Sequence, residues 1–495
     1  MTRSIVRLSR SLILLLALPT LALAQARSAA TPLTLTDALR LAQTGAEALR
    51  IAEAGVLRAE GQQAQARSQY LPQMNGSFAY QRAIQNQFQA ITKRLSSNEP
   101  DTGSSGGGGD FTDSPIARIF AAPNTAIIGV TFSQNLFTAG RLAASKALAE
   151  AGRRGADLTL SGARAQIVVD VAQAYYDAVA SDRIVQIAES TLAQTERALA
   201  QVSLQKSVGS LAEFDQLRAA VARDNTVPVV LQARTTRELA YLRLKQLLSL
   251  PGNTELALTT PLRDTVSAAE AQAMSLATVL SSRTRLVGDS VIDTRPDTTL
   301  GMRAPVRQAQ AAVEASEAAL RAARWERLPS LQLTSNYQRF GYPPEGTFLP
   351  NSMGLFFPNW NVTFGMSFPL FTGGRIGGDR RVAQANLIEA QQRLQQTREL
   401  ADLDLRSTLA QYEQALAGYA AVAGAAEQAH RAYAIAEVRY AERISTALEL
   451  AESRTQLQQA RLNRVNAAKT LEVARLRLAL IRDLPLAAPN IGGRD

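Results

Sequence analysis

The chain has 495 residues, a formal net charge of +10, one histidine and no cysteine. The lack of cysteine excludes disulfides, cysteine-ligated metals and a lipidated N-terminal cysteine. Lys and Arg residues are interleaved with Asp and Glu along helical stretches, and no nucleic-acid-binding motif accompanies them. This pattern favours solvated helix surfaces over DNA or RNA binding.

Residues 1–26 have the features of a bacterial secretory signal. Three arginines precede the apolar run Leu12 to Leu18, and small residues from Ala22 to Ala26 supply a cleavage site. The run is too short to span a membrane as a helix, and no later segment approaches about 18 consecutive apolar residues. Cleavage removes three arginines and lowers the net charge from +10 to +7. The sequence therefore predicts an exported protein without inner-membrane helices.

The remainder of the chain contains two copies of one unit. Segments 67–82 and 324–339 share Arg, Leu-Pro and Tyr-Gln-Arg at positions 257 residues apart, whereas LFTAGR at 136–141 returns as LFTGGR 234 residues later. The two offsets differ by 23, which indicates an insertion in the first copy. Because the period is far longer than that of a solenoid, it indicates a duplicated half-molecule. We expect a first repeat at 27–250, an equatorial linker at 251–303, a second repeat at 304–482 and a loose tail at 483–495.

Each copy is expected to open with a helix, roughly Thr36 to Tyr70 and Ala304 to Arg327, that ends at Leu-Pro. Proline disfavours helical geometry in the residue before it, so a strand should follow. Apolar residues then alternate with small or polar ones, as in Trp360, Val362 and Phe364. This pattern predicts strands at about 73–83, 125–137, 330–341 and 360–371.

Strands of this length and alternation are typical of a transmembrane β-barrel. The alternative interpretation is a soluble hairpin that packs one face against a hydrophobic core. The many aromatic residues beside long solvated helices disfavour it. Four strands cannot close a cylinder, so several chains would have to share one barrel. The intervening loops, roughly 83–126 and 340–359, would face outwards, and the first contains the flexible segment Ser104 to Gly109.

The glycine pairs after each strand pair could be mistaken for a phosphate-binding loop. Neither copy has the spacing of such a loop, so a tight corner between strand and helix is the better interpretation. The predicted corner residues are Gly140, Arg141, Gly373, Gly374 and Arg375.

A long helix should follow each corner, from about Leu142 to Lys206 in the first copy. Apolar residues repeat every seven positions from Val171 to Leu199, and from Leu405 to Tyr433 in the second copy, which predicts a coiled-coil seam in both. The single histidine, His430, falls on this seam, so packing between helices is expected rather than metal binding.

Each long helix then turns back, at about 207–216 and 441–450. Gly209 suits the end of a helix, and Asp215, six residues later, suits the first turn of the returning helix. With its paired corners, duplicated strand pairs and Gly-x5-Asp tip, the chain resembles the TolC-like outer-membrane efflux proteins over nearly its whole mature length.

The resemblance implies a mainly α fold with a membrane β-barrel. Members of this family are homotrimers with a shared twelve-stranded barrel and a helical tunnel in the periplasm. The tunnel meets a periplasmic adaptor (membrane fusion) protein and an inner-membrane pump or ABC transporter. The implied location is the outer membrane of a Gram-negative cell, in contact with its lipid.

The resemblance also suggests roles for residues at the two tips. Glu449 and Glu452 match acidic residues that ring the periplasmic entrance, and Tyr440 and Asp215 match a latch between hairpins. The tip residues expected to contact the adaptor are Gly209, Ser210, Leu211, Arg443, Ile444 and Ser445. Arg443 stands where the family usually has glycine, and Phe214 and Ser445 replace polar partners of the closing network.

The expected function is a passive exit duct of a tripartite efflux or type I secretion system, with no catalysis, cofactor, metal or nucleic-acid partner. A periplasmic adaptor is an alternative, but it would show one helical hairpin instead of two. A secreted coiled-coil scaffold without membrane contact is another, and it would stay soluble on membrane fractionation. The sequence leaves the cargo open.

Overall fold

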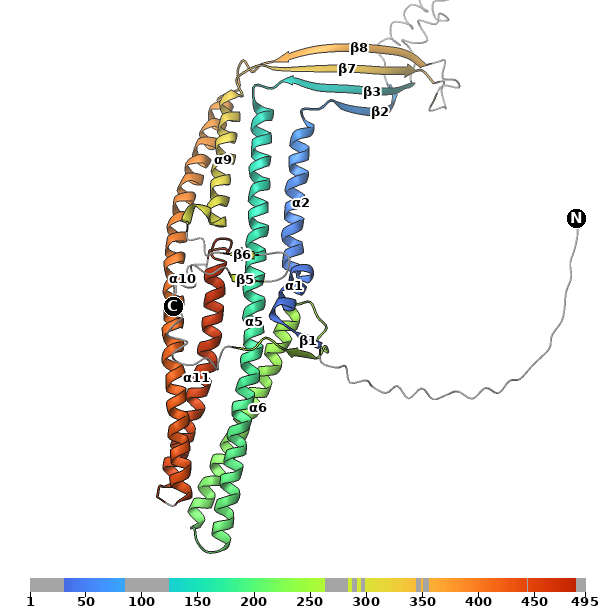
Figure 1. The fold of residues 1–495 in the computed structure, drawn as a ribbon. Coiled ribbons are helices and arrows are strands. Elements are labelled where there is room, and N and C mark those ends of the chain that lie inside the picture. Colours follow the sequence, from blue (N-terminus) through green and yellow to red (C-terminus); the bar gives the residue numbers. More distant parts are fainter. Residues whose placement is uncertain are drawn as a thin grey trace, which may run out of the picture.

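The computed structural model describes residues 31–84, 124–262, 284–286, 292–294, 299–343, 349, 356–442 and 444–486. The secretory signal, most of both strand-connecting loops, much of the linker, Arg443 and residues 487–495 lie outside this part of the chain. Within it, a sheet lies at one end of an elongated helical body, and two helical hairpins reach the opposite end (Figure 1).

The helices of the two copies correspond closely. α5 (Arg141–Ser207) and α10 (Arg375–Ala441) both have 67 residues, and their starts are 234 positions apart. α2 (Glu47–Ser68) and α9 (Ala304–Trp325) both have 22 residues and start 257 positions apart. The duplication in the sequence is therefore a duplication of structural units.

Each long helix pairs with a shorter returning helix to form a hairpin. α6 (Glu213–Leu247) returns along α5, and α11 (Ala447–Ala479) returns along α10. No helix in the described ranges is long and apolar enough to cross a membrane.

The expected opening helix of the first copy is interrupted. α1 (Leu35–Gly45) and α2 are separated at Ala46, whose ψ of 124° is extended rather than helical. Ala46 N–H still donates to the Ala42 carbonyl and so satisfies the end of α1, while α2 begins in a new direction. The helical stretch expected from about Thr36 to Tyr70 is therefore two helices, and Gly45, the last residue of α1, lies directly before the break.

Four strands form one antiparallel sheet in the order β2-β3-β7-β8. Three of them lie close to their expected positions: β2 (Gln73–Arg82), β3 (Asn124–Phe137) and β7 (Ser330–Gly341). Among the described strands, β2 and β8 each have one edge without a partner.

β8 spans Phe356–Ser367, four residues earlier than the expected 360–371. It pairs with β7 from Ser330↔Ser367 to Gly341↔Phe356, so the register of β7 fixes both of its ends. Pro369 cannot donate a ladder hydrogen bond beyond Ser367. Pro358 is tolerated inside β8 because this is an edge strand.

The largest cluster of buried apolar residues lies midway along the body, where α1, α5, α10 and α11 meet. Tyr175 and Tyr412 are fully buried there. The Tyr175 hydroxyl donates to the Leu33 carbonyl and accepts from Thr260 N–H, both at 2.9 Å. It thereby holds together the parallel strands β1 (Thr31–Leu33) and β4 (Leu256–Leu258).

The short strands β5 (Thr284–Leu286) and β6 (Ile292–Thr294) form a separate antiparallel pair, and the short 3-10 helix η1 (Leu300–Met302) precedes α9.

Candidate functional site

The first hairpin tip is a helix stop built on Gly209, which has a φ of +73°. Gly209 N–H donates to the Lys206 carbonyl and Ser210 N–H to the Gln205 carbonyl, both at 2.9 Å. These two bonds form a Schellman motif, which requires a left-handed residue and therefore favours glycine. The tip is braced by Lys206 Nζ, which donates to Gln216 Oε1 at 2.7 Å.

The second tip repeats part of this pattern. Ile444 N–H donates to the Arg439 carbonyl at 2.8 Å, 234 positions after the Ser210 bond to Gln205. Arg443, the residue that replaces glycine, lies outside the described residues. The returning helix α11 is N-capped by Thr446, whose hydroxyl accepts from Glu449 N–H at 3.3 Å.

The two glutamates expected at the entrance differ in their surroundings. Arg439 Nη1 lies 2.9 Å from Glu449 Oε1 and forms an ion pair within the second hairpin. Glu452 lies one turn later and is exposed. The Glu449 carboxylate is therefore paired within its own hairpin, because the tip brings α10 and α11 close enough for this ion pair to form.

Asp215 and Tyr440 line the same groove between the two hairpins, which has a volume of about 410 Å³. Asp215 lies in the first turn of α6, and Tyr440 lies at the end of α10. No hydrogen bond between the two is present in this structure of the single chain, although both groups are described. Leu211 and Ser445 line the groove as well, whereas Ile444 is exposed at the tip.

Arg454 of α11 also lines this groove. Burial is the main effect on this guanidinium, and it lowers the pKa of Arg454. Across the hairpin, burial and the nearby Glu437 carboxylate raise the pKa of Tyr433. His430, expected to pack in the helical seam, is exposed, so that expectation was wrong for the single chain.

Comparison with known proteins decides the family. A family model described as "Outer membrane efflux protein" matches residues 38–250 and 296–481, which is most of the chain. The chain belongs to the outer membrane efflux protein family. A sequence comparison with curated proteins gives no match.

Solved structures show the same fold for this efflux protein. The Campylobacter jejuni CmeC outer membrane channel is 18% identical with a TM-score of 0.67, over 92% of this chain and 87% of that one. The Vibrio cholerae outer membrane protein VceC is 17% identical with a TM-score of 0.67, over 91% and 95%. The Neisseria gonorrhoeae MtrE outer membrane channel, in its open state, is 19% identical with a TM-score of 0.66, over 91% and 89%. The efflux protein accordingly lies in the Gram-negative outer membrane and has a helical periplasmic part.

The glycine pairs of the efflux protein lie where the strands meet the long helices. Gly140 has a φ of +80° and Gly374 a φ of +88°, and each immediately precedes its helix. A Cβ on Gly140 would lie 2.1 Å from the Trp325 ring, whereas a Cβ on Gly374 would meet nothing within 4 Å. Gly140 therefore combines a left-handed backbone with close packing.

The arginines after the glycines begin the long helices. Arg375 pairs with Glu326 and with Asp379, each at 2.8 Å, which joins the end of α9 to the start of α10. Arg141 N–H donates to the Thr138 carbonyl at 3.1 Å and closes the corner turn. Gly373 has a φ of +59°, and its counterpart in the first copy is Ala139 with a φ of +51°.

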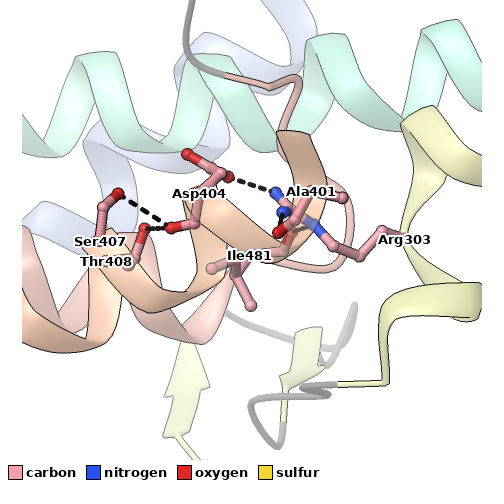
Figure 2. A network of polar contacts seen from close by, with 6 residues as sticks. All are labelled: Arg303, Ala401, Asp404, Ser407, Thr408 and Ile481. Atoms are coloured by element: carbon pink, nitrogen blue, oxygen red, sulfur yellow. Dashed lines mark hydrogen bonds and ion pairs between the residues drawn. The ribbon is translucent and has the colours of Figure 1, made fainter. Parts of the chain in front are cut away.

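Sequence reasoning missed a buried polar network around Arg303 (Figure 2). This side chain is 1% exposed, and its Nη2 lies 2.5 Å from Asp404 Oδ2. Nη1 donates to the Ala401 carbonyl at 2.7 Å, and Nε donates to the Ile481 carbonyl at 3.2 Å. The network ties the end of the linker to α10 and to the C-terminal end of α11. A lone arginine before a helix gives no signal of this role in the sequence.

A second missed network joins α5 to α6. Tyr241 donates to Asp182 Oδ2 at 2.7 Å, and the Arg237 guanidinium pairs with the same carboxylate. Arg237 also lies over the Tyr241 ring, 4.8 Å from its centroid. Burial, followed by the hydrogen bond to Asp182, raises the pKa of Tyr241. The first hairpin is thus braced well away from its tip.

Proposed function

We propose that three copies of this efflux protein form one passive exit duct, which carries substrates from the periplasm to the exterior. Two features support a multichain barrel. The sheet has four strands with two open edges, and open edges are not tolerated in lipid. Closure needs at least about eight strands. Three chains would provide twelve, the number that members of the family share.

The observation that carries the proposal is the position of the two hairpins. Both tips lie at the end of the molecule opposite the sheet, and the long helices α5 and α10 run without a break from the sheet to these tips (Figure 1). With the sheet in the outer membrane, the tips would form the periplasmic entrance. The assembly would serve tripartite efflux or type I secretion and would need no chemistry of its own.

We propose that Glu449 and Glu452 together determine ion selection at this entrance. Two carboxylates per chain in a trimer would focus a negative potential on a narrow opening. Because Arg439 pairs with Glu449, Glu452 would contribute the larger part of that potential.

Selectivity in planar bilayers tests this role. The double variant Glu449→Ala and Glu452→Ala should lose cation selectivity and block by multivalent cations. The control, Glu47→Ala with Glu53→Ala, removes two exposed carboxylates from α2, far from the tips. Unchanged selectivity in the tip variant, or an equal loss in the control, would contradict the proposal.

We propose further that Tyr440 and Asp215 hold the entrance closed. They line one groove, so a small movement of the hairpins would bring them together. A hydrogen bond from a phenol to a carboxylate contributes roughly 1.5–3 kcal/mol, and three would bias the equilibrium strongly towards closure. Tyr440→Phe with Asp215→Ala should raise single-channel conductance and sensitise cells to vancomycin. Parent-like conductance in a normally assembled variant would show that other residues close the duct.

The groove and the tips would also be the docking place of the periplasmic adaptor, which links the duct to the inner-membrane pump or ABC transporter. The proposed contact residues are Gly209, Ser210, Leu211, Arg443, Ile444 and Ser445. Crosslinking from a photoreactive residue at Ile444, which is exposed, should capture the adaptor in cells that express both proteins. Crosslinks that appear only from positions on the sheet would contradict this arrangement.

A further inference from the structure

The Tyr-Gln-Arg motif occurs in both copies, at 80–82 and 337–339, and the proposed duct does not use it. In the structure the two motifs lie in equivalent strands, β2 and β7. Arg82 is the last residue of β2, and Arg339 lies two residues before the end of β7. Both strands enter the sheet from a helix at their other end, so the arginines lie at the end of the sheet remote from the helical body (Figure 1).

The strand register places both motifs on one face of the sheet. Phe78, Ile128 and Arg339 form one row across three strands, and Val130, Tyr337 and Trp360 form the next. Since side chains alternate along a strand, the Tyr and Arg of each motif share a face and the Gln lies on the other.

The two faces differ in chemistry. The face with Tyr and Arg carries exposed apolar side chains, namely Met74, Phe78, Ile128, Val130, Trp360, Val362, Phe364 and Met366. The opposite face is rich in amides and hydroxyls, including Asn75, Ser77, Thr131, Asn336, Asn361 and Thr363. In an outer-membrane sheet the apolar face contacts lipid, so Arg82 and Arg339 are on the lipid-facing side.

Arg82 and Arg339 are the only charged residues in the four strands of the sheet. An arginine on the lipid face costs about 2–4 kcal/mol at the middle of the bilayer but roughly 0–1 near the interface. Their place near the outer end of the strands avoids the larger penalty. Tyrosines are enriched at membrane interfaces, which fits their position two residues before each arginine.

The guanidinium groups are also unpaired within the part of the chain that the structure describes. Neither Arg82 nor Arg339 has an ion-pair partner among the residues that the structure describes, and Arg339 Nε is buried without a hydrogen bond. An arginine fork matches the oxygen geometry of a phosphate and binds it in a bidentate manner. The long side chain can reach the headgroup layer while its stem remains against apolar neighbours.

We propose that each Tyr-x-Arg pair, Tyr80 with Arg82 and Tyr337 with Arg339, binds a phosphate-bearing headgroup of the outer-leaflet glycolipid. The tyrosine lies at the interface, and the arginine donates to the phosphate. Because the motif is duplicated, every chain has two such binding sites on its lipid-facing side. The inference rests on the outer-membrane location and is independent of gating at the tips.

Native mass spectrometry of the detergent-purified full chain tests the proposal, with bisphosphorylated lipid A as the probe. The parent should retain it, and dephosphorylated lipid A or inorganic phosphate should bind at least tenfold more weakly. Arg82→Gln with Arg339→Gln should lower retention about tenfold, which corresponds to about 1.4 kcal/mol. The control Arg50→Gln with Arg381→Gln removes two exposed charges from helices and should behave like the parent.

Equal retention in the strand variant and the parent would overturn the proposal, as would equal binding of dephosphorylated lipid A. If the glutamine variant fails to insert, Arg82→Lys with Arg339→Lys keeps both charges but loses the bidentate fork. It should show partial loss of retention, and unchanged retention would again refute the inference. Bilayer conductance should be normal in all inserted variants, which separates failure of this proposal from failure of the duct.

Discussion

Replacing Arg303 with alanine should destabilise the folded chain far more than replacing an exposed arginine. Arg303 is 1% exposed and Asp404 18% exposed, so the substitution leaves a largely buried carboxylate without its partner. Removing one member of a buried pair costs about 3–5 kcal/mol. Because Asp404 keeps some contact with solvent, we expect a loss of about 3 kcal/mol, near the lower end of that range.

The neighbouring pair of Arg406 with Asp402 provides a matched control. Its atoms lie 2.9 Å apart on the same helix, but Arg406 is 77% exposed. Exposed pairs of this kind contribute about 0–1 kcal/mol. Arg406→Ala should therefore change stability by less than about 1 kcal/mol, although it also removes an arginine that pairs with an aspartate.

Thermal unfolding followed by circular dichroism in detergent separates the two cases. In a large domain 1 kcal/mol corresponds to about 2 °C, so Arg303→Ala should lower the midpoint by about 5 °C or more. Asp404→Asn should have a smaller effect, because the amide oxygen still accepts from Arg303 and both carbonyl partners remain. Equal midpoints for the Arg303 and Arg406 variants would refute the assignment of a buried anchor.

Two further predictions concern the corners and the first hairpin. Gly374→Ala should lower the free energy of unfolding by about 1–2 kcal/mol, because alanine is strained in the left-handed backbone. Gly140→Ala should lower it clearly more, because the Trp325 ring must also move. Thermal midpoints compare the two variants, and equal midpoints would contradict this prediction. The folded state raises the pKa of Tyr241, so its contribution to stability is present below the unfolded pKa of about 10 and is lost as the pH rises above it. The thermal midpoint of the parent should therefore fall as the pH rises above about 10, and it should fall less in Tyr241→Phe. If the midpoints of the two proteins depend on pH in the same way, groups other than Tyr241 cause the loss of stability at alkaline pH.

Local patterns in the sequence predicted the elements of this protein. Leu71-Pro72 and Leu328-Pro329 mark the change from helix to strand, and alternation over about ten residues indicates the strands that follow. Gly209 signals the end of α5 because a Schellman motif needs a left-handed residue. Such signals are readable because the interactions that produce them join residues close together in the chain.

The tertiary structure decided how these elements contact one another. The register of β8 depends on β7, so its bounds could not be obtained from its own alternation. Arg303 and Asp404 are 101 residues apart, and only the packing of α9 against α10 brings them together. Glu449 and Asp215 occupy equivalent positions, yet only Glu449 has an arginine across its hairpin, at 439. A side chain's charge and shape are fixed by the sequence, but its partners are fixed by distances that exist only after the helices have packed.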